Sequence, residues 1–219
     1  ALGYQGKVKQ AINELEKIIS TKRTEWYILQ DLANFYSSLN QLEQAISFSC
    51  RAALASGEYK TKVTLYMNIA QLSLDTGNIE IAVRNIELSK AIREQEGWKI
   101  KQDLQQLDSQ IYQELEKSQK TVELESKNIN YLLKLCQKDW EKQAYFNLPQ
   151  QSGIINYLPQ DKSHGFVITD DGKRIFFLQK DLPPYLRKEK LKVDFNLEKN
   201  WDRKQQKISF KAVNFSACF

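Results

Sequence analysis

The sequence predicts an α+β protein of two domains, in which an array of antiparallel helical hairpins precedes a small five-stranded β-barrel. Apolar residues recur with helical spacing over the first two thirds of the 219 residues, and from Gly153 onward the apolar period shortens to two. Apolar side chains make up 42% of the chain, which is enough to build two compact cores. We place the domains at residues 1–149 and 150–219.

The helical spacing divides the first domain into seven segments separated by short polar turns. Asn40 precedes Leu42 with Glu43 next to it, and Gly77-Asn78 can end one helix and cap the next. We expect helices at about 6–20, 25–38, 42–56, 63–76 and 79–93. Two longer amphipathic helices, at about 98–117 and 121–145, are expected to cap the array.

A phrase built around a small residue recurs along these helices. Ala11, Ala45 and Ala82 open similar phrases at intervals of 34 and 37 residues. Ala33 and Ala70 form a second series, also 37 residues apart, and each lies twelve residues before Ala45 or Ala82. Small residues recur where two helices touch closely, so we expect these alanines to be buried at helix contacts.

This pattern resembles the tetratricopeptide repeat. The matching positions are Leu29, Leu32, Ala33, Tyr36, Leu42, Ala45 and Ala52 in one unit, and Leu65, Ile69, Ala70, Gly77, Ile79 and Ala82 in the next. Ser49 stands where the family usually has an aromatic residue, and the family's terminal proline is absent. The resemblance implies a concave surface that takes a peptide or a neighbouring domain; a spacer without a ligand is the alternative. Its register puts Ala1–Tyr4 at the end of a helix that begins upstream, so we expect a fragment of a longer protein.

Five short strands are predicted in the second domain. The apolar runs lie at 153–157, 165–169, 174–178, 191–197 and 208–213, and Asp170-Asp171-Gly172 joins the second run to the third as a hairpin. Five strands within about 65 residues are typical of a small barrel of the OB type. Phe177, Phe195 and Phe210 are the candidates for its aromatic core.

Four phrases in this domain resemble, in order, those of cold-shock domains. They lie at 153–157, 162–167, 175–178 and 212–215. The resemblance implies that single-stranded RNA or DNA binds to one face of the barrel, with bases stacked on Tyr157, His164, Phe166 and Phe176 and with Lys162 near the phosphates. Tyr157, His164 and Leu178 replace the family's Trp, aromatic and His, which reduces the stacking area.

The charge distribution favours a polyanionic partner for the second domain. Residues 1–149 carry 19 Lys and Arg against 19 Asp and Glu, whereas residues 150–219 carry 13 against 8. The whole net charge of +5 therefore belongs to the predicted barrel. The basic residues expected to contact a nucleic-acid backbone from connecting loops are Lys173, Arg174, Arg187, Lys188, Lys190, Arg203, Lys204 and Lys207.

The usual signatures of enzymes, metal sites and membrane proteins are missing from the sequence. Cys50, Cys136 and Cys218 lie far apart, His164 is the only histidine, and the eight glycines form no phosphate-binding loop. We therefore predict no catalytic residue, metal or cofactor. No window approaches eighteen uncharged apolar residues and no secretory leader is recognisable, so we expect a cytoplasmic protein without a membrane partner.

Three functional hypotheses follow. The first is a non-catalytic adaptor, in which the barrel binds single-stranded RNA or DNA and the helical array docks a protein partner or an upstream domain. The second is a pure protein-interaction module. The third is the sensor or positioning end of a larger enzyme, such as a nuclease or NTPase, whose catalytic domain precedes Ala1.

Overall fold

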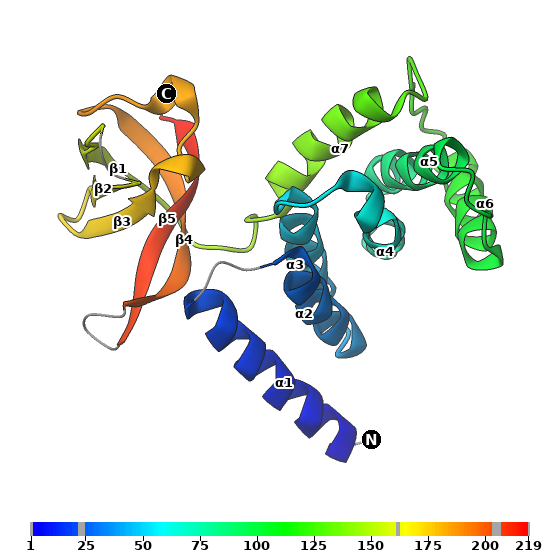
Figure 1. Cartoon of the computed structure of the whole chain (residues 1–219), viewed down its shortest axis with the longest axis horizontal. Helices are drawn as coiled ribbons and strands as arrows, with labels where there is room; N and C mark the ends of the chain where they lie inside the picture. The colour runs from blue at the N-terminus through cyan, green and yellow to red at the C-terminus, as the bar shows by residue number, and fades with distance from the viewer. Residues whose placement is uncertain (1, 22–24, 161–162, 203–206, 219) are drawn as a thin grey trace. The chain divides into compact units, whose positions relative to one another are not determined.

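The computed structural model describes residues 2–21, 25–160, 163–202 and 207–218. Within these ranges the chain forms seven α-helices followed by five strands that close into a barrel (Figure 1). The predicted fold class is confirmed. Two compact units divide between Phe146 and Asn147, and each has its own hydrophobic core.

The helical unit is built from consecutive hairpins. Its helices are α1 (Leu2–Thr21), α2 (Trp26–Ser38), α3 (Leu42–Leu54), α4 (Val63–Asp75), α5 (Ile79–Gln95), α6 (Gln102–Lys117) and α7 (Ile129–Gln143). α2 packs against α3, α4 packs against α5, and α3 joins the two hairpins through its contact with α4. Residues 2–4 belong to α1, which runs without interruption to Thr21, so the register predicted for Ala1–Tyr4 is wrong for its described residues.

Four of the five alanines predicted at helix contacts are buried, whereas Ala11 is only partly buried. Ala45 and Ala82 are fully excluded from solvent, and only 1% of Ala33 is exposed. Ala45 belongs to the main core, whereas Ala82 packs with Ala70 in a smaller cluster that also includes residues of α6. A larger side chain at these positions would push neighbouring helices apart.

α7 packs against α3 and α5 and completes the core shared by the two hairpins (Figure 1). Its Trp140 ring stacks on Tyr66 of α4, with 5.2 Å between ring centroids. The Trp140 Nε1 also donates a hydrogen bond to Oδ1 of the buried Asn85, at 2.9 Å. Next to this pair, Arg84 contacts both carboxylate oxygens of Asp139, at 2.9 and 3.0 Å.

α7 begins eight residues later than the sequence predicts. Val122 and Leu124 pack against the core from non-helical backbone, so their apolar character does not signal a helix. Lys127 then contacts the buried Glu87, with 3.1 Å between the charged atoms. Asn128 caps the helix, because its Oδ1 accepts a hydrogen bond from the backbone N–H of Asn130 at 2.9 Å.

The barrel contains strands β1 (Gln150–Tyr157), β2 (His164–Thr169), β3 (Arg174–Leu178), β4 (Lys192–Asp202) and β5 (Lys207–Ala217). Their order around the barrel is β1-β2-β3-β5-β4, and β4 pairs back onto β1 to close it. All pairs are antiparallel except β3 with β5. This is the order of an OB-type barrel.

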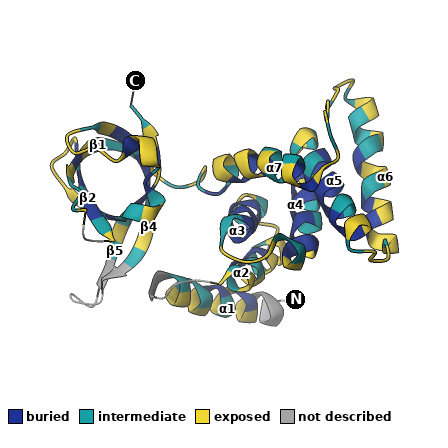
Figure 2. Cartoon of the chain, turned by 45° about the horizontal axis from the view of Figure 1, so that its top comes forward, coloured by how far each residue is buried: buried dark blue, intermediate teal, exposed yellow. Residues whose placement is uncertain are grey.

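Buried residues recur along the strands of the closed barrel (Figure 2). Aromatic residues fill the barrel interior. Phe215 contacts Phe177 and Phe195, with ring centroids 5.1 and 5.7 Å apart, and each of these three side chains is buried. Phe210 was predicted to join them and does not, because 46% of it is exposed. Phe210 pairs with Lys199 in a part of β4 and β5 that extends beyond the hydrophobic core of the barrel. A side chain that alternation would point inward therefore has no core to join there.

We predict that Trp140→Ala lowers the free energy of unfolding of the helical unit by about 3–5 kcal/mol, because it removes a buried ring and leaves Asn85 without its partner. Trp98→Ala is the matched control, since 42% of Trp98 is exposed, and should change the value by less than about 1 kcal/mol. Urea unfolding followed by far-ultraviolet circular dichroism measures both. Equal effects of the two substitutions would contradict the packing role of α7.

Candidate nucleic-acid interface

A β-bulge turns the side chain of Tyr157 to the outside of the barrel. Ile155 pairs with Val167 and Tyr157 pairs with Phe166, so Asn156 is an extra residue on β1. Ile155 is fully buried, and regular alternation would point Tyr157, two residues later, into the same interior. The bulge shifts the alternation by one residue and places Tyr157 beside Phe166.

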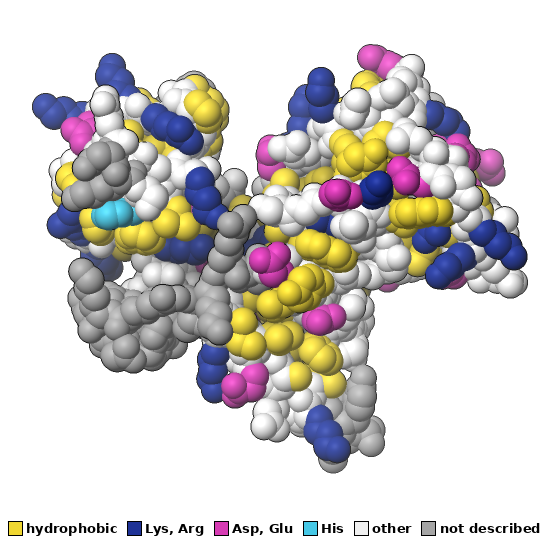
Figure 3. Space-filling view, in the orientation of Figure 1, with side chains coloured by type: hydrophobic (Ala, Val, Ile, Leu, Met, Phe, Trp, Pro, Cys, Tyr) yellow, Lys and Arg dark blue, Asp and Glu magenta, His cyan; other side chains and the backbone are white. Residues whose placement is uncertain are grey.

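Four aromatic rings meet on the outer face of β1, β2 and β3; we call Tyr157, His164, Phe166 and Phe176 the aromatic cluster. The centroid of Phe166 lies 6.0 Å from those of Tyr157 and Phe176, and 5.9 Å from that of His164. All four side chains are partly exposed. In Figure 3 the single histidine lies beside hydrophobic surface on the barrel. The structure therefore brings together the four residues predicted to stack with bases.

The cluster is stepped and not flat. The His164 and Phe176 rings lie within 29° of parallel, whereas Phe166 stands at 86° to His164 and at 70° to Phe176. Tyr157 is tilted by 44° from Phe166. Such a surface suits bases that are splayed apart and held one at a time, as in single strands.

The register of the sheet places an apolar row next to the cluster, which the sequence analysis missed. Ile154 of β1 pairs with Ile168 of β2, and Ile168 pairs with Arg174 of β3. On its other side Ile154 pairs with Lys192 of β4, so a cation stands at each end of the row. Ile154 and Ile168 each stand one residue from buried positions, which was the available signal that they face outward, but only the pairing shows that they are neighbours.

Arg174 lies on a strand, as the predicted run 174–178 implies, and not in a connecting loop with the other basic residues. It is the first residue of β3, and its guanidinium carbon lies 3.8 Å from the centroid of the Phe166 ring. Lys173 is in the preceding turn, where its Nζ lies 2.6 Å from Oδ2 of Asp171. Hydrogen bonds from Lys173 and Thr169 hold the pKa of the Asp171 carboxyl below its usual range.

The other predicted basic contacts are dispersed. Lys162, Arg203 and Lys204 lie outside the described residues, as does the side chain of Lys207. Arg187 has a structural role, since its guanidinium donates to the carbonyl oxygens of Leu182 and Gln179 at 3.1 and 3.2 Å. Lys188 and Lys190 are exposed in the connection before β4.

The cluster combines stacking surfaces with the cation Arg174. Burial raises the pKa of the Asp181 carboxyl in the barrel, and the nearby charges of Lys211 and Lys180 oppose this rise. In the described ranges no group of His, Cys, Asp and Glu side chains could hold a metal ion. The chemistry available is binding of flat rings and of anions.

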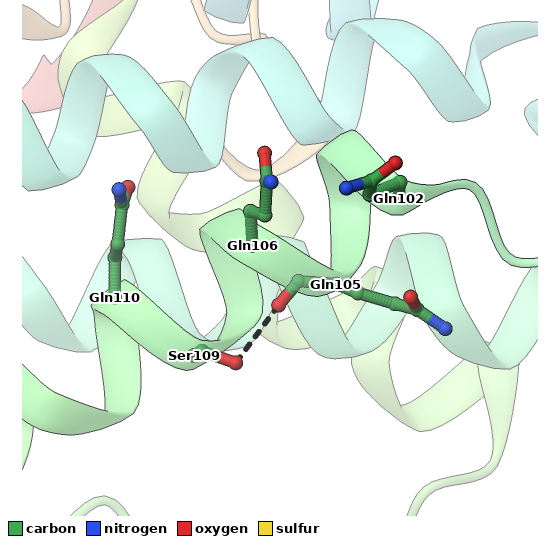
Figure 4. Close-up of a pocket in the computed structure, with 5 residues that line it drawn as sticks. All are labelled: Gln102, Gln105, Gln106, Ser109 and Gln110. Carbon is green, nitrogen blue, oxygen red and sulfur yellow. Dashed lines mark hydrogen bonds between the residues drawn. The ribbon is translucent and has the colours of Figure 1, made fainter.

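A shallow depression runs along α6 of the helical unit (Figure 4). Its lining is neutral and polar: Gln102, Gln105, Gln106, Ser109 and Gln110. Ser109 donates a hydrogen bond from its Oγ to the backbone oxygen of Gln105, at 3.0 Å, so its hydroxyl is already satisfied within the helix. The four amides each carry both donors and acceptors, which suits them to a polypeptide backbone.

A helical-hairpin array followed by an OB-type barrel with outward aromatic rings defines the architecture of this protein. Residues 1–130 match the family described as a domain of unknown function, DUF7017, and the chain belongs to that family. The match covers α1 to α6 and the first residues of α7, so the barrel lies beyond it. No curated protein matches the chain. Among the described helices, none has the length and apolar character needed to cross a bilayer.

Gly165 is required for the close approach of β1 and β3 to β2 at the cluster. A Cβ at this position would lie 2.6 Å from the carbonyl oxygen of Tyr157 and would overlap the Phe177 ring. We predict that Gly165→Ala lowers the stability of the barrel by about 1–3 kcal/mol. Thermal unfolding followed by near-ultraviolet circular dichroism measures the change.

Gly172→Asn is the control for this substitution. Gly172 has open space around it and a φ of +81°, a conformation that Asn tolerates. Its replacement should cost less than about 1 kcal/mol. A Gly165→Ala barrel as stable as the control would show that the strands move apart without cost.

Proposed function

We propose that this protein is a non-catalytic adaptor whose barrel binds single-stranded RNA or DNA and whose helical array docks a protein partner or a neighbouring domain. The observation that carries the proposal is the aromatic cluster. Three strands contribute four partly exposed rings to one outer face, in a barrel whose interior is already filled by Phe177, Phe195 and Phe215. The cluster therefore belongs to the outer surface of the barrel and not to its core.

Physical chemistry supports a nucleic-acid ligand for this face. Every base has a flat face, and stacking on an aromatic side chain contributes about 1–3 kcal/mol per base without requiring a particular sequence. The net charge of +5 in residues 150–219 supplies attraction to phosphates. The OB order of the strands and the ordered cold-shock phrases add to this support.

The helical array supports the protein-docking half of the proposal. Its buried alanines recur at the spacing of tetratricopeptide units, which stack into extended binding surfaces. The amide-lined depression on α6 carries no charge, so it suits an extended, uncharged stretch of polypeptide.

A protein-binding barrel is the second candidate, and three exposed apolar residues favour it. Ile154, Tyr185 and Phe210 are 45%, 75% and 46% exposed on the barrel unit. Large exposed apolar side chains are typical of protein interfaces when they gather in one patch. The two candidates differ in salt dependence, because counterion release accompanies nucleic-acid binding.

We predict that Phe176→Ala weakens binding of a short single-stranded oligonucleotide by about 1–3 kcal/mol, because one stacking ring is lost. Fluorescence anisotropy with labelled RNA and DNA, using the full chain at low and moderate salt, measures it. Phe210→Ala is the control, since it removes an exposed aromatic ring of the same barrel outside the cluster.

The control should bind the oligonucleotide like the unchanged protein. Circular dichroism of both variants verifies that the barrel is folded. If the folded, unchanged chain shows no salt-sensitive binding to any single strand, the adaptor proposal fails and the protein-binding barrel takes its place.

A further inference from the structure

The guanidinium of Arg174 lies over the Phe166 ring of the aromatic cluster. The guanidinium carbon of Arg174 lies 3.8 Å from the ring centroid, which is well within the distance of a cation–π contact. One face of Phe166 is thus covered. A ligand that approaches this face meets the guanidinium and not the ring.

The position of this guanidinium is set by the sheet. Arg174 is the first residue of β3 and pairs with Ile168 of β2. The turn before it is closed by three hydrogen bonds between Thr169 and Lys173. The backbone nitrogen of Lys173 donates to Thr169 Oγ1 at 2.9 Å, and the Lys173 carbonyl oxygen accepts from the Thr169 nitrogen at 2.9 Å and from Thr169 Oγ1 at 3.1 Å. The backbone of Arg174 is therefore fixed by the strand and the turn, and its side chain lies over the ring of Phe166 on the neighbouring strand β2.

Arg174 differs from its cationic neighbours in how it is paired. Lys173 lies 2.6 Å from a carboxylate oxygen of Asp171, and Lys211 lies 2.7 Å from one of Glu198. No carboxylate in the described part of the chain pairs with Arg174, which is exposed. Its exposed guanidinium over Phe166 therefore keeps N–H donors for a ligand.

We propose that Arg174 selects bases in the single strand that present two adjacent hydrogen-bond acceptors on one edge. This inference rests on the proposed nucleic-acid binding and deepens it. A base that stacks on the aromatic cluster beside Phe166 lies next to the guanidinium over that ring and can turn an edge toward it. The planar fork of arginine donates two parallel hydrogen bonds to such an edge.

Two bases offer this edge. Guanine presents O6 and N7 side by side, and an unpaired cytosine presents N3 and O2. Adenine places a donor next to each of its N1 and N7 acceptors, and in thymine and uracil the N3–H donor separates the two carbonyl oxygens. Arg174 therefore favours guanine or cytosine over adenine, thymine and uracil. A cation that only contacted phosphates would strengthen binding of all sequences equally.

The test uses the full chain and a short labelled oligothymidine carrying one central guanine, 7-deazaguanine, cytosine or adenine, with anisotropy measured at one fixed salt concentration. The unchanged protein should prefer the guanine or the cytosine oligonucleotide over the adenine one by roughly 5- to 100-fold, the size of one paired-hydrogen-bond contact. If guanine is the preferred base, 7-deazaguanine, which lacks the N7 acceptor, should lose most of the preference.

Three variants separate selection from charge. Arg174→Lys keeps the charge and loses the planar fork, and Arg174→Ala loses both; each should bring the preference between bases to about one. Lys173→Ala removes a neighbouring charge that contacts no ring, and should weaken binding of all four oligonucleotides by a similar factor. Arg174 is exposed, so circular dichroism should show unchanged folding of its variants.

The outcomes distinguish this inference from the function on which it rests. Salt-sensitive binding without a preference among the bases, or a preference that persists in Arg174→Lys, overturns the selection by Arg174 and leaves the proposed function standing. Absence of binding to every oligonucleotide overturns both.

Discussion

The limited interior of the small barrel is the constraint on which the candidate site depends. Phe177, Phe195 and Phe215 contact one another inside it, and Gly165 has no side chain because the Phe177 ring lies where a Cβ would stand. With the interior filled, the remaining aromatic residues of β1, β2 and β3 have only the outer face available. An aromatic surface exposed to water costs free energy unless something covers it, and this is the physical reason to expect a ligand there.

The helical unit depends on a different feature, the polar face of α5. Burial opposes ionisation of Glu87, but hydrogen bonds from Lys90, Lys127 and Tyr112 outweigh it and hold the pKa of this carboxyl below its ordinary value. One turn earlier, Arg84 and Asn85 bind Asp139 and Trp140 of α7. The seven helices and the buried alanines could be predicted because they follow from local periodicity. The packing of α7 against α5 could not be predicted, since the residues that pair across this contact lie 55 residues apart in the chain.

The same division applies to the site. Alternation along β2 correctly indicated that His164 and Phe166 share a face, and the hairpin at Asp170-Asp171-Gly172 indicated that β3 lies next to them. Alternation gave a wrong prediction for Phe210, because the strands there extend beyond the hydrophobic core. It also could not show the contact between Arg174 and Phe166, because that contact depends on the pairing of β2 with β3. Sequence patterns give the face of each residue, whereas neighbours on that face come from strand pairing and side-chain direction.

The extra residue at Asn156 has a consequence for the way relatives of this barrel are aligned. An alignment that runs through β1 without a gap at this position matches Tyr157 to interior residues of barrels with a regular first strand. The aromatic cluster would then seem to have lost one member. A gap at Asn156 restores the equivalence of Tyr157 with outward-facing residues, so homologues should be compared by strand pairing before the residues of this surface are scored as kept or lost.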